Sequence, residues 1–348
     1  MSRTVVYVPL ENLPQRYTPM ANEQMAALCD STVGDCEGGR ASVISHGQFL
    51  DIVETNVFKA EQCSRISRLL GGWIKGEKGA LFFADIYHPG VTVARYIIDL
   101  MGLDIIVGGF NYAGRADPND FLQRCGEWCM WQDAAFNAAC NTVFVGSPYH
   151  RRNVERMMAE CRIAAPPEVM ATGYAWNPEW VNRVRAEPIK PTLDKIPRVI
   201  WPHRWCDEKG TDRLMAVARM MPDTEFVVTS CGKVADGAEQ RARAKNVVVR
   251  DMLTKQEYYR LMNDSRFYLS TARQETFGYT LQEAILHRCV IVVPNDACYP
   301  DMVSSECLYA SLCDIPAMFM RGHVEPLSAT MRHATNAYVA VSTMRDAT

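Results

Sequence analysis

The chain has 348 residues, and its 37 basic and 40 acidic side chains give a formal net charge of −3. Apolar residues make up 48% of it, yet no apolar run approaches the roughly 18 residues of a membrane span. These values argue against a membrane protein and against a strongly basic protein that grips duplex DNA by charge, and the length suits two domains.

The thirteen cysteines have no regular spacing and form no CxxC pair, and the seven histidines form no HxxxH pair. This pattern predicts reduced thiols and no metal site built by protein side chains. The N-terminal segment lacks the long apolar stretch of a signal peptide, so we expect a cytoplasmic protein.

The apolar segment Val5–Pro9 predicts the first strand, and the polar loop after it carries Glu11, Arg16 and Tyr17. In an α/β domain such a loop lies at the ligand edge of the sheet. The three side chains are therefore candidate ligand contacts. The alternative is an ordinary connection between a strand and a helix.

The continuous apolar run Ala80–Ala84 predicts a central parallel strand. Asp85 and His88 follow at its carboxyl end, where they could contact a reacting ligand or its hydroxyl groups. The alternative is that Asp85 caps the next helix and His88 packs in the loop.

A glycine-rich loop, GGFNYAGRADPND, follows the next strand, and it offers Arg115 and Asp117 as further candidate ligand contacts. The alternative is a loop that only starts a helix. The segment Phe121–Cys140 predicts one long helix, with Trp128 and Trp131 expected in the core.

In the second half, strands such as RVIW, EFVVTS and VIVVP alternate with helical patterns, which predicts a parallel doubly wound sheet. Arg204 and Lys209 lie in a loop after the first of these strands, and Gly210 precedes a helix. Two cations at the carboxyl end of a strand favour an anionic ligand. Because a loop cation contributes little to stability, replacing Lys209 with alanine is expected to cost activity far more than folding.

The segment STARQETFGYTLQE runs from a strand through a loop into a helix. Glu275 and Glu283 bracket the turn Thr276-Phe277-Gly278, where unpaired N–H groups at a helix start can bind phosphate. One phosphate-bearing ligand could meet a carboxylate at each end. The alternative is a strand-loop-helix unit with two solvated glutamates.

In this order and spacing, the Arg, the Lys-Gly, the EFVVTS strand and the E-x7-E motif resemble the nucleotide-sugar half of retaining GT-B glycosyltransferases of the glycogen-synthase-like kind. The resemblance covers roughly 197–301. It implies an α/β fold of two Rossmann-like, doubly wound parallel-sheet domains facing a central cleft. We expect an acceptor-binding domain at 1–180, a linker at 181–196, a nucleotide-sugar domain at 197–315 and a helical tail at 316–348 that packs back on the first domain.

The resemblance also implies site roles. Arg204 and Lys209 would neutralise the departing phosphate with the N–H groups of the Thr276-Phe277-Gly278 turn, Glu275 would contact the hydroxyls of the sugar, and Glu283 would hold the ribose. Asp85 and His88 would help to position the sugar. The expected acceptor contacts are Glu11, Arg16, Tyr17, Arg115 and Asp117. No metal or cofactor is implied beyond a nucleotide-sugar co-substrate, expected to be a UDP-sugar. The sequence departs from the usual Gly-Gly loop after the first strand.

Three first-half segments, VPLENLPQRYT, FFADIYHPG and YAGRADPNDF, are similar to glycosyltransferases encoded by tailed bacteriophages that add sugars to hydroxymethylated pyrimidines of phage DNA. The HRW segment and its following lysine also resemble enzymes that mannosylate the queuosine base of tRNA. The expected acceptor is therefore a hydroxymethylated base in DNA, within the host cytoplasm if the chain is phage-encoded. The alternatives are tRNA, a cell-envelope glycan or lipid, and a non-catalytic protein that binds nucleotide sugar or nucleic acid.

Overall fold

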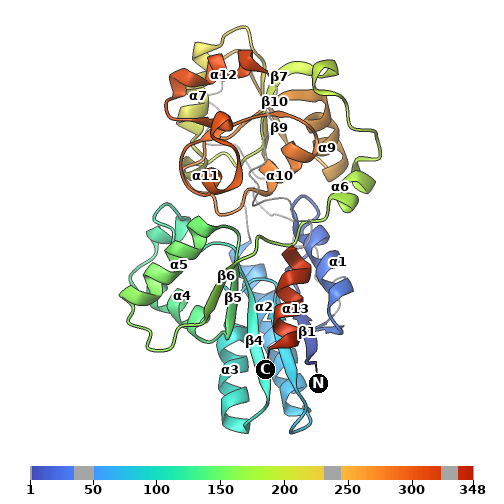
Figure 1. Ribbon diagram of the computed structural model, residues 1–348, viewed down its shortest axis with the longest axis vertical. Helices are drawn as coiled ribbons and strands as arrows, with labels where there is room; N and C mark the ends of the chain where they lie inside the picture. Colours follow the sequence, from blue (N-terminus) through green and yellow to red (C-terminus); the bar gives the residue numbers. More distant parts are fainter. Residues whose placement is uncertain (1, 35–50, 231–243, 323–335, 348) are drawn as a thin grey trace.

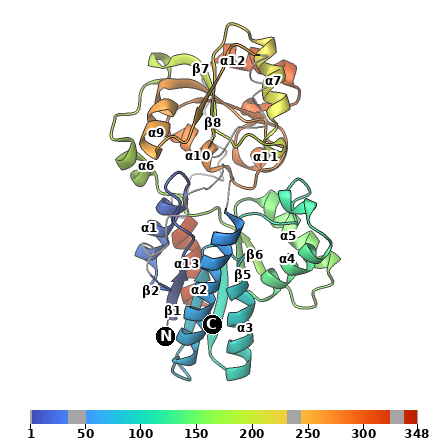
Figure 2. The same ribbon diagram turned by 180° about the vertical axis from the view of Figure 1, so that it is seen from behind.

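The computed structural model describes residues 2–34, 51–230, 244–322 and 336–347. Two six-stranded parallel sheets are stacked along the long axis of the molecule, with helices packed around each (Figures 1 and 2). The doubly wound α/β architecture predicted from the sequence is therefore present in both halves.

The first sheet has the order β2-β1-β3-β4-β5-β6. Its strands are β1 Thr4–Val8, β2 Ser31–Thr32, β3 Gly79–Phe83, β4 Ile105–Asn111, β5 Thr142–Val145 and β6 Glu168–Ala171. Its helices are α1 Thr18–Leu28, α2 Ile52–Gly71, α3 Pro89–Met101, α4 Trp128–Ala138 and α5 Pro148–Glu160. The expected long helix over 121–140 is instead a 3-10 turn, η2 Phe121–Arg124, followed by α4.

Side chains that alternate along β1 divide the first domain into two cores. Val5 and Tyr7 pack on the face covered by α1, whereas Val6 and Val8 pack on the face covered by α2 and α3. All four are buried. Because both faces are covered, the carboxyl edge of the sheet is where a ligand can reach it.

The second sheet has the order β12-β11-β10-β7-β8-β9. Its strands are β7 Ile196–Trp201, β8 Phe226–Ser230, β9 Val247–Asp251, β10 Ser265–Leu269, β11 Val290–Pro294 and β12 Leu308–Tyr309. Its helices are α7 Thr211–Met220, α9 Lys255–Asp264, α10 Tyr279–Leu286, α11 Tyr299–Met302 and α12 Ile315–Arg321.

Two helices lie where the sequence suggested a linker and a tail. Helix α6, Pro178–Arg185, packs against α9 of the second domain. Helix α13, Asn336–Asp346, lies beside α1 and contacts β1, β3 and β4, so the end of the described chain returns to the first domain (Figure 1). Residues 323–335 of the expected tail lie outside the described residues.

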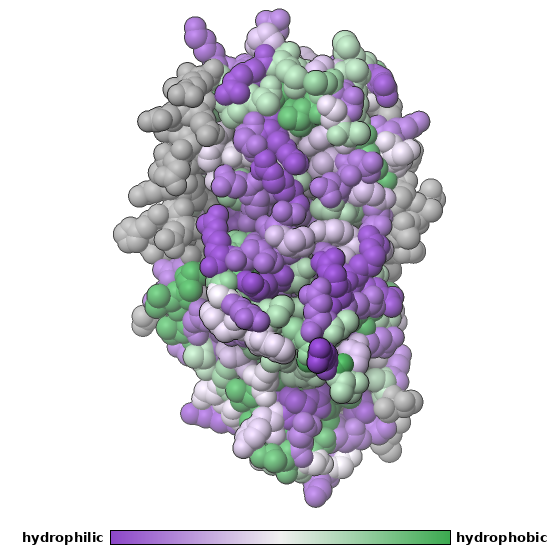
Figure 3. All heavy atoms as spheres, turned by 90° about the vertical axis from the view of Figure 1, so that its left-hand side faces the viewer, coloured by the Kyte–Doolittle hydropathy of each residue, from purple (hydrophilic) through white to green (hydrophobic). Residues whose placement is uncertain are grey.

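The two domains also touch on the face that carries α5, α7 and α11, where hydrophilic side chains gather around the middle of the molecule (Figure 3). Asp301 accepts a hydrogen bond from the Tyr149 N–H at 2.8 Å and lies 3.4 Å from the Arg152 guanidinium. These contacts join α5 to α11 across the domain boundary.

Candidate active site

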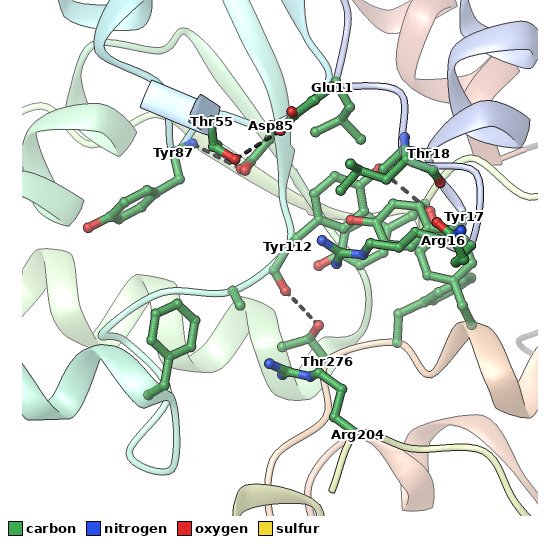
Figure 4. A pocket seen from close by; sticks show the side chains of 18 of the residues that line it. Glu11, Arg16, Tyr17, Thr18, Thr55, Asp85, Tyr87, Tyr112, Arg204 and Thr276 are labelled. Carbon is green, nitrogen blue, oxygen red and sulfur yellow. Dashed lines mark hydrogen bonds between the residues drawn. The ribbon is translucent and has the colours of Figure 1, made fainter. Parts of the chain in front are cut away.

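A cleft of about 720 Å³ lies between the domains, lined by loops from the carboxyl ends of both sheets. Glu11, Thr55 and Asp85 lie together on the first-domain side, and Arg204 enters from the second domain (Figure 4). A volume of this size suits a small-molecule ligand.

The turn before α10 organises the second-domain side of the cleft. Gly278 has a φ of 71°, the left-handed region that favours glycine. This turn directs the N–H groups of Thr276 and Gly278 to one carboxylate oxygen of Glu275, at 3.2 and 3.1 Å. The side chain of Phe277 is buried against Tyr174, so only its backbone is available to a ligand.

Glu275 is held in its ionised form. Burial alone would raise the pKa of Glu275, but the Lys209 ammonium, 3.4 Å away, and the two N–H groups outweigh burial, so the pKa lies below its usual value. Lys209 also donates to the carbonyl and side-chain oxygens of Gln274, at 2.7 and 3.0 Å. The cation is therefore fixed in the cleft wall before any ligand arrives.

Gly210 explains why Lys209 sits so close to the α10 turn. It has a φ of 71° and caps α7, and a Cβ there would clash with the Thr271 carbonyl oxygen. The backbone of the Lys209 loop thus lies directly on the loop that follows β10. Arg204 lines the cleft beside this loop and forms an ion pair with Glu208.

Glu283 lies in a buried polar cluster rather than in solvent. Its carboxylate accepts hydrogen bonds from Lys255 at 3.0 Å, Tyr258 at 2.7 Å and Tyr259 at 3.0 Å. It also lines the cleft. The alternative of two solvated glutamates is wrong, since Glu275 and Glu283 are both held by surrounding donors.

On the first-domain side, the Asp85 carboxylate accepts from the Tyr87 N–H at 3.0 Å. Burial raises its pKa, and the nearby Lys59 only partly opposes this shift. Glu11 accepts from the Thr55 hydroxyl at 2.9 Å. Both carboxylates can still accept a hydrogen bond from a hydroxyl group of a ligand in the cleft.

His88 is a helix cap. Its Nδ1 accepts from the Gly90 N–H at 2.8 Å, so the ring proton is on Nε2, which lies 2.9 Å from the Gln62 side-chain oxygen. Burial lowers the pKa of His88 to about 3. It lines the cleft, but both ring nitrogens are bonded within the fold, and the capping role suggested for Asp85 belongs to His88.

Arg16 and Tyr17 lie at the junction of the domains. The Tyr17 ring stacks on Tyr279 with centroids 4.1 Å apart and an interplanar angle of 11°, and the Arg16 guanidinium lies 5.4 Å from the Tyr17 centroid. The Thr276 hydroxyl donates to the Tyr112 carbonyl at 2.7 Å. The residues that make these contacts line the cleft, and the contacts join its two walls.

Arg115 and Asp117 are the two candidates that the structure does not bring to the cleft. Arg115 donates to the carbonyl oxygens of Leu122 and Cys125, at 3.3 and 2.8 Å. Asp117 is fully buried and accepts from the Asn119 N–H at 2.9 Å. Arg115 thus ties the loop to η2, and Asp117 holds the turn before it. The alternative of a loop that starts a helix is close, but the residue that caps η2 is Asp120.

Sequence reasoning missed several cleft residues. Trp128 was expected in the core, but it is 61% exposed and lines the cleft, while Trp131 is 52% exposed and faces elsewhere. The spacing of apolar residues along α4 does not indicate that one tryptophan lines the cleft and the other does not. His203 also lines the cleft, and its buried Nε2 has no partner among the described residues.

Within the described residues, no group of three His, Cys, Asp or Glu side chains is placed to hold a metal ion. No helix in that part of the chain is long and apolar enough to span a bilayer.

No protein-family model matches the chain. A tRNA-queuosine alpha-mannosyltransferase from Drosophila melanogaster is 28% identical over 134 residues, which are 36% of this chain and 36% of that protein. The chain therefore matches about a third of the length of this curated relative.

Three solved structures share the fold over most of the chain. Trehalose 6-phosphate synthase from Burkholderia multivorans has a TM-score of 0.64 at 12% identity, covering 99% of this chain and 97% of its own. Sucrose-phosphate synthase from Thermosynechococcus elongatus gives 0.64 at 12%, covering 99% and 95%. TarM from S. aureus, solved with UDP, gives 0.53 at 13%, covering 82% and 55%. The chain has the two-domain GT-B fold.

Proposed function

We propose that the protein is a glycosyltransferase that moves a sugar from a nucleotide-sugar donor to an acceptor hydroxyl in the interdomain cleft. The observation that supports it most is the meeting of Arg204, Lys209 and Glu275 at the turn before α10. Cations and a fixed carboxylate there match what a sugar diphosphate needs. The GT-B fold supports the same assignment.

Cleavage of the sugar–oxygen bond places growing negative charge on the departing diphosphate. Lys209 and Arg204 would stabilise this charge from positions fixed beforehand. The ionised Glu275 would accept hydrogen bonds from the sugar hydroxyls, and the Glu283 cluster would hold the ribose. Because side chains already neutralise the leaving group, the proposal includes no metal ion.

We propose that the reaction retains the configuration of the sugar, because the acceptor attacks the face that the leaving group departs from. A phosphate oxygen of the donor takes the acceptor proton, and no protein nucleophile is required. Asp85 and Glu11 then orient the acceptor hydroxyl. His88 is left out of the proton transfer because both ring nitrogens are bonded.

The first proposed acceptor is a hydroxymethylated pyrimidine in DNA, which rests on the similarity of the first-half segments to bacteriophage enzymes. The second is a modified base of tRNA, which the likeness to a tRNA-queuosine alpha-mannosyltransferase favours.

To test this function, the protein is incubated with UDP- and GDP-sugars and four acceptors: hydroxymethylcytosine DNA, hydroxymethyluracil DNA, unmodified DNA and queuosine tRNA. Digested nucleosides are weighed by mass spectrometry, with and without EDTA. We expect a pentose or hexose increment on one modified base, unaffected by EDTA.

Arg204→Ala should lose this activity, whereas Arg219→Ala, at an exposed position near the end of α7, should keep it. Donor binding without any increment would move the search to glycans. No donor binding at all would favour the non-catalytic alternative and refute the proposal.

A further inference from the structure

We propose that the first-domain side of the cleft contains a slot for the planar base of a nucleic-acid acceptor, with Trp128 and Phe121 as its stacking wall. This inference rests on the proposed function and names how the acceptor is recognised. None of the sequence patterns assigned these two side chains to a site.

One wall is the first two turns of α2. Four of its side chains follow the spacing i, i+3, i+4 and i+7, so they share one helical face. All four line the cleft: Ile52, Thr55, Asn56 and Lys59. Ile52 is 55% exposed, so this wall offers an apolar residue at the mouth and polar groups further in.

The other wall is aromatic. Trp128, Gln132 and Phe136 follow one another at four-residue intervals along α4, and all three line the cleft. Phe136 is 5% exposed and Trp128 is 61% exposed, so the wall runs from the interior to the mouth. Phe121, 40% exposed, extends it from η2.

Tyr87 joins the two walls and sets the floor of the slot. Its carbonyl accepts from Lys59 of α2 at 2.6 Å, and its hydroxyl donates to Gln132 of α4 at 3.1 Å. Its ring meets Phe136 edge to face at 5.2 Å. Asp85, which binds the Tyr87 N–H, lies at the bottom with its carboxylate toward the cleft (Figure 4).

A nucleobase is the occupant whose chemistry matches these features. A flat ring can stack on exposed aromatic side chains whatever its sequence, and its edges can bond to amides and hydroxyls of the opposite wall. In a 3-10 helix, residues three apart share a side, so the exposed Arg124 lies next to Phe121 and can meet a phosphate. Trp128 and Phe121 are exposed, so a base stacked on them can stay joined to a strand that lies outside the slot.

The test measures binding of a fluorescein-labelled single strand that carries one hydroxymethylcytosine, by anisotropy at fixed salt. Trp128→Ala and Phe121→Ala are each expected to weaken binding about tenfold. Trp131→Ala is the matched control, because Trp131 lies on the same helix, is 52% exposed and does not line the cleft. UDP binding, measured by calorimetry, should be unchanged in all three variants.

Two outcomes would overturn the slot: a wild-type protein that does not bind the strand, or variants of Trp128 and Phe121 that bind it as tightly as Trp131→Ala does. A carbohydrate could also stack there, so maltopentaose is the competing probe. Binding of maltopentaose that depends on Trp128, without binding of the strand, would assign the slot to sugars instead. If the wild-type protein does not bind UDP, the proposed function itself is refuted. If it binds UDP but does not bind the strand, or binds the strand without help from Trp128 and Phe121, only the slot is refuted.

Discussion

Replacing Lys209 with alanine should lower the stability of the fold as well as the activity. As a loop cation, Lys209 was expected to matter for activity and little for folding. In the structure its side chain is 9% exposed, and its ammonium bonds to Gln274 and lies 3.4 Å from Glu275. The substitution therefore leaves a carboxylate that is 17% exposed without its cation.

Removing one partner of a fully buried ion pair costs about 3–5 kcal/mol. Glu275 keeps two N–H donors and is not completely buried, so we expect a loss of about 2–3 kcal/mol of unfolding free energy at pH 7. UDP affinity should fall as well, because in the proposed function the same cation faces the diphosphate.

The loss should depend on pH. In the wild type the lowered pKa of Glu275 stabilises the fold above the usual pKa of a glutamate, and this stabilisation disappears as the pH falls through the lowered value. Without Lys209 the pKa of Glu275 rises. The gap in stability between wild type and variant should therefore be widest near pH 7 and narrow as the pH approaches about 4.

The assay is urea denaturation of the unliganded proteins at pH 7 and pH 4.5, followed by circular dichroism, with UDP titration at pH 7. Lys209→Met, which keeps most of the aliphatic chain, separates lost packing from lost charge. Equal midpoints for wild type and Lys209→Ala at pH 7 would refute the reasoning, and so would a gap that widens at low pH.

Three further predictions follow from the same structure. Gly210→Ala should destabilise the protein by more than Gly102→Ala, because both glycines have positive φ but only at Gly210 would the new Cβ clash with backbone; denaturant midpoints compare them, and equal shifts would contradict this. Tyr17→Ala removes the stack on Tyr279 and should loosen domain closure, seen as a larger radius of gyration by X-ray scattering without UDP, while an unchanged radius would argue against the stack as a clasp. Burial raises the pKa of Asp133 to about 7, so ionisation of this carboxyl lowers the unfolding free energy as the pH rises from about 4 to 7. Asp133→Asn should reduce that fall in unfolding free energy, measured by urea titration across the pH range, and an unchanged fall would contradict the prediction.

The sequence by itself determined the architecture and brought Lys209 and Glu275 to the same edge of the second sheet. Apolar runs such as Ala80–Ala84 specify buried parallel strands, and the turn chemistry around Gly278 specifies where α10 begins. Glycines and strand ends act locally, so Lys209 and Glu275 could be placed at the same sheet edge before their contact was known.

Only the tertiary structure decided which side chains reach the cleft. Arg115 follows the same sequence logic as Asp85, but the carbonyl oxygens of Leu122 and Cys125 hold its guanidinium outside the cleft. His88 does line the cleft, yet Gly90 and Gln62 already bond both of its ring nitrogens. Trp128 has the pattern of a core residue, yet α4 begins at the cleft mouth and leaves it exposed. Whether a side chain meets ligand, backbone or solvent depends on how elements distant in the chain pack together. Such packing produces no periodic pattern in the local sequence, so the sequence does not predict it.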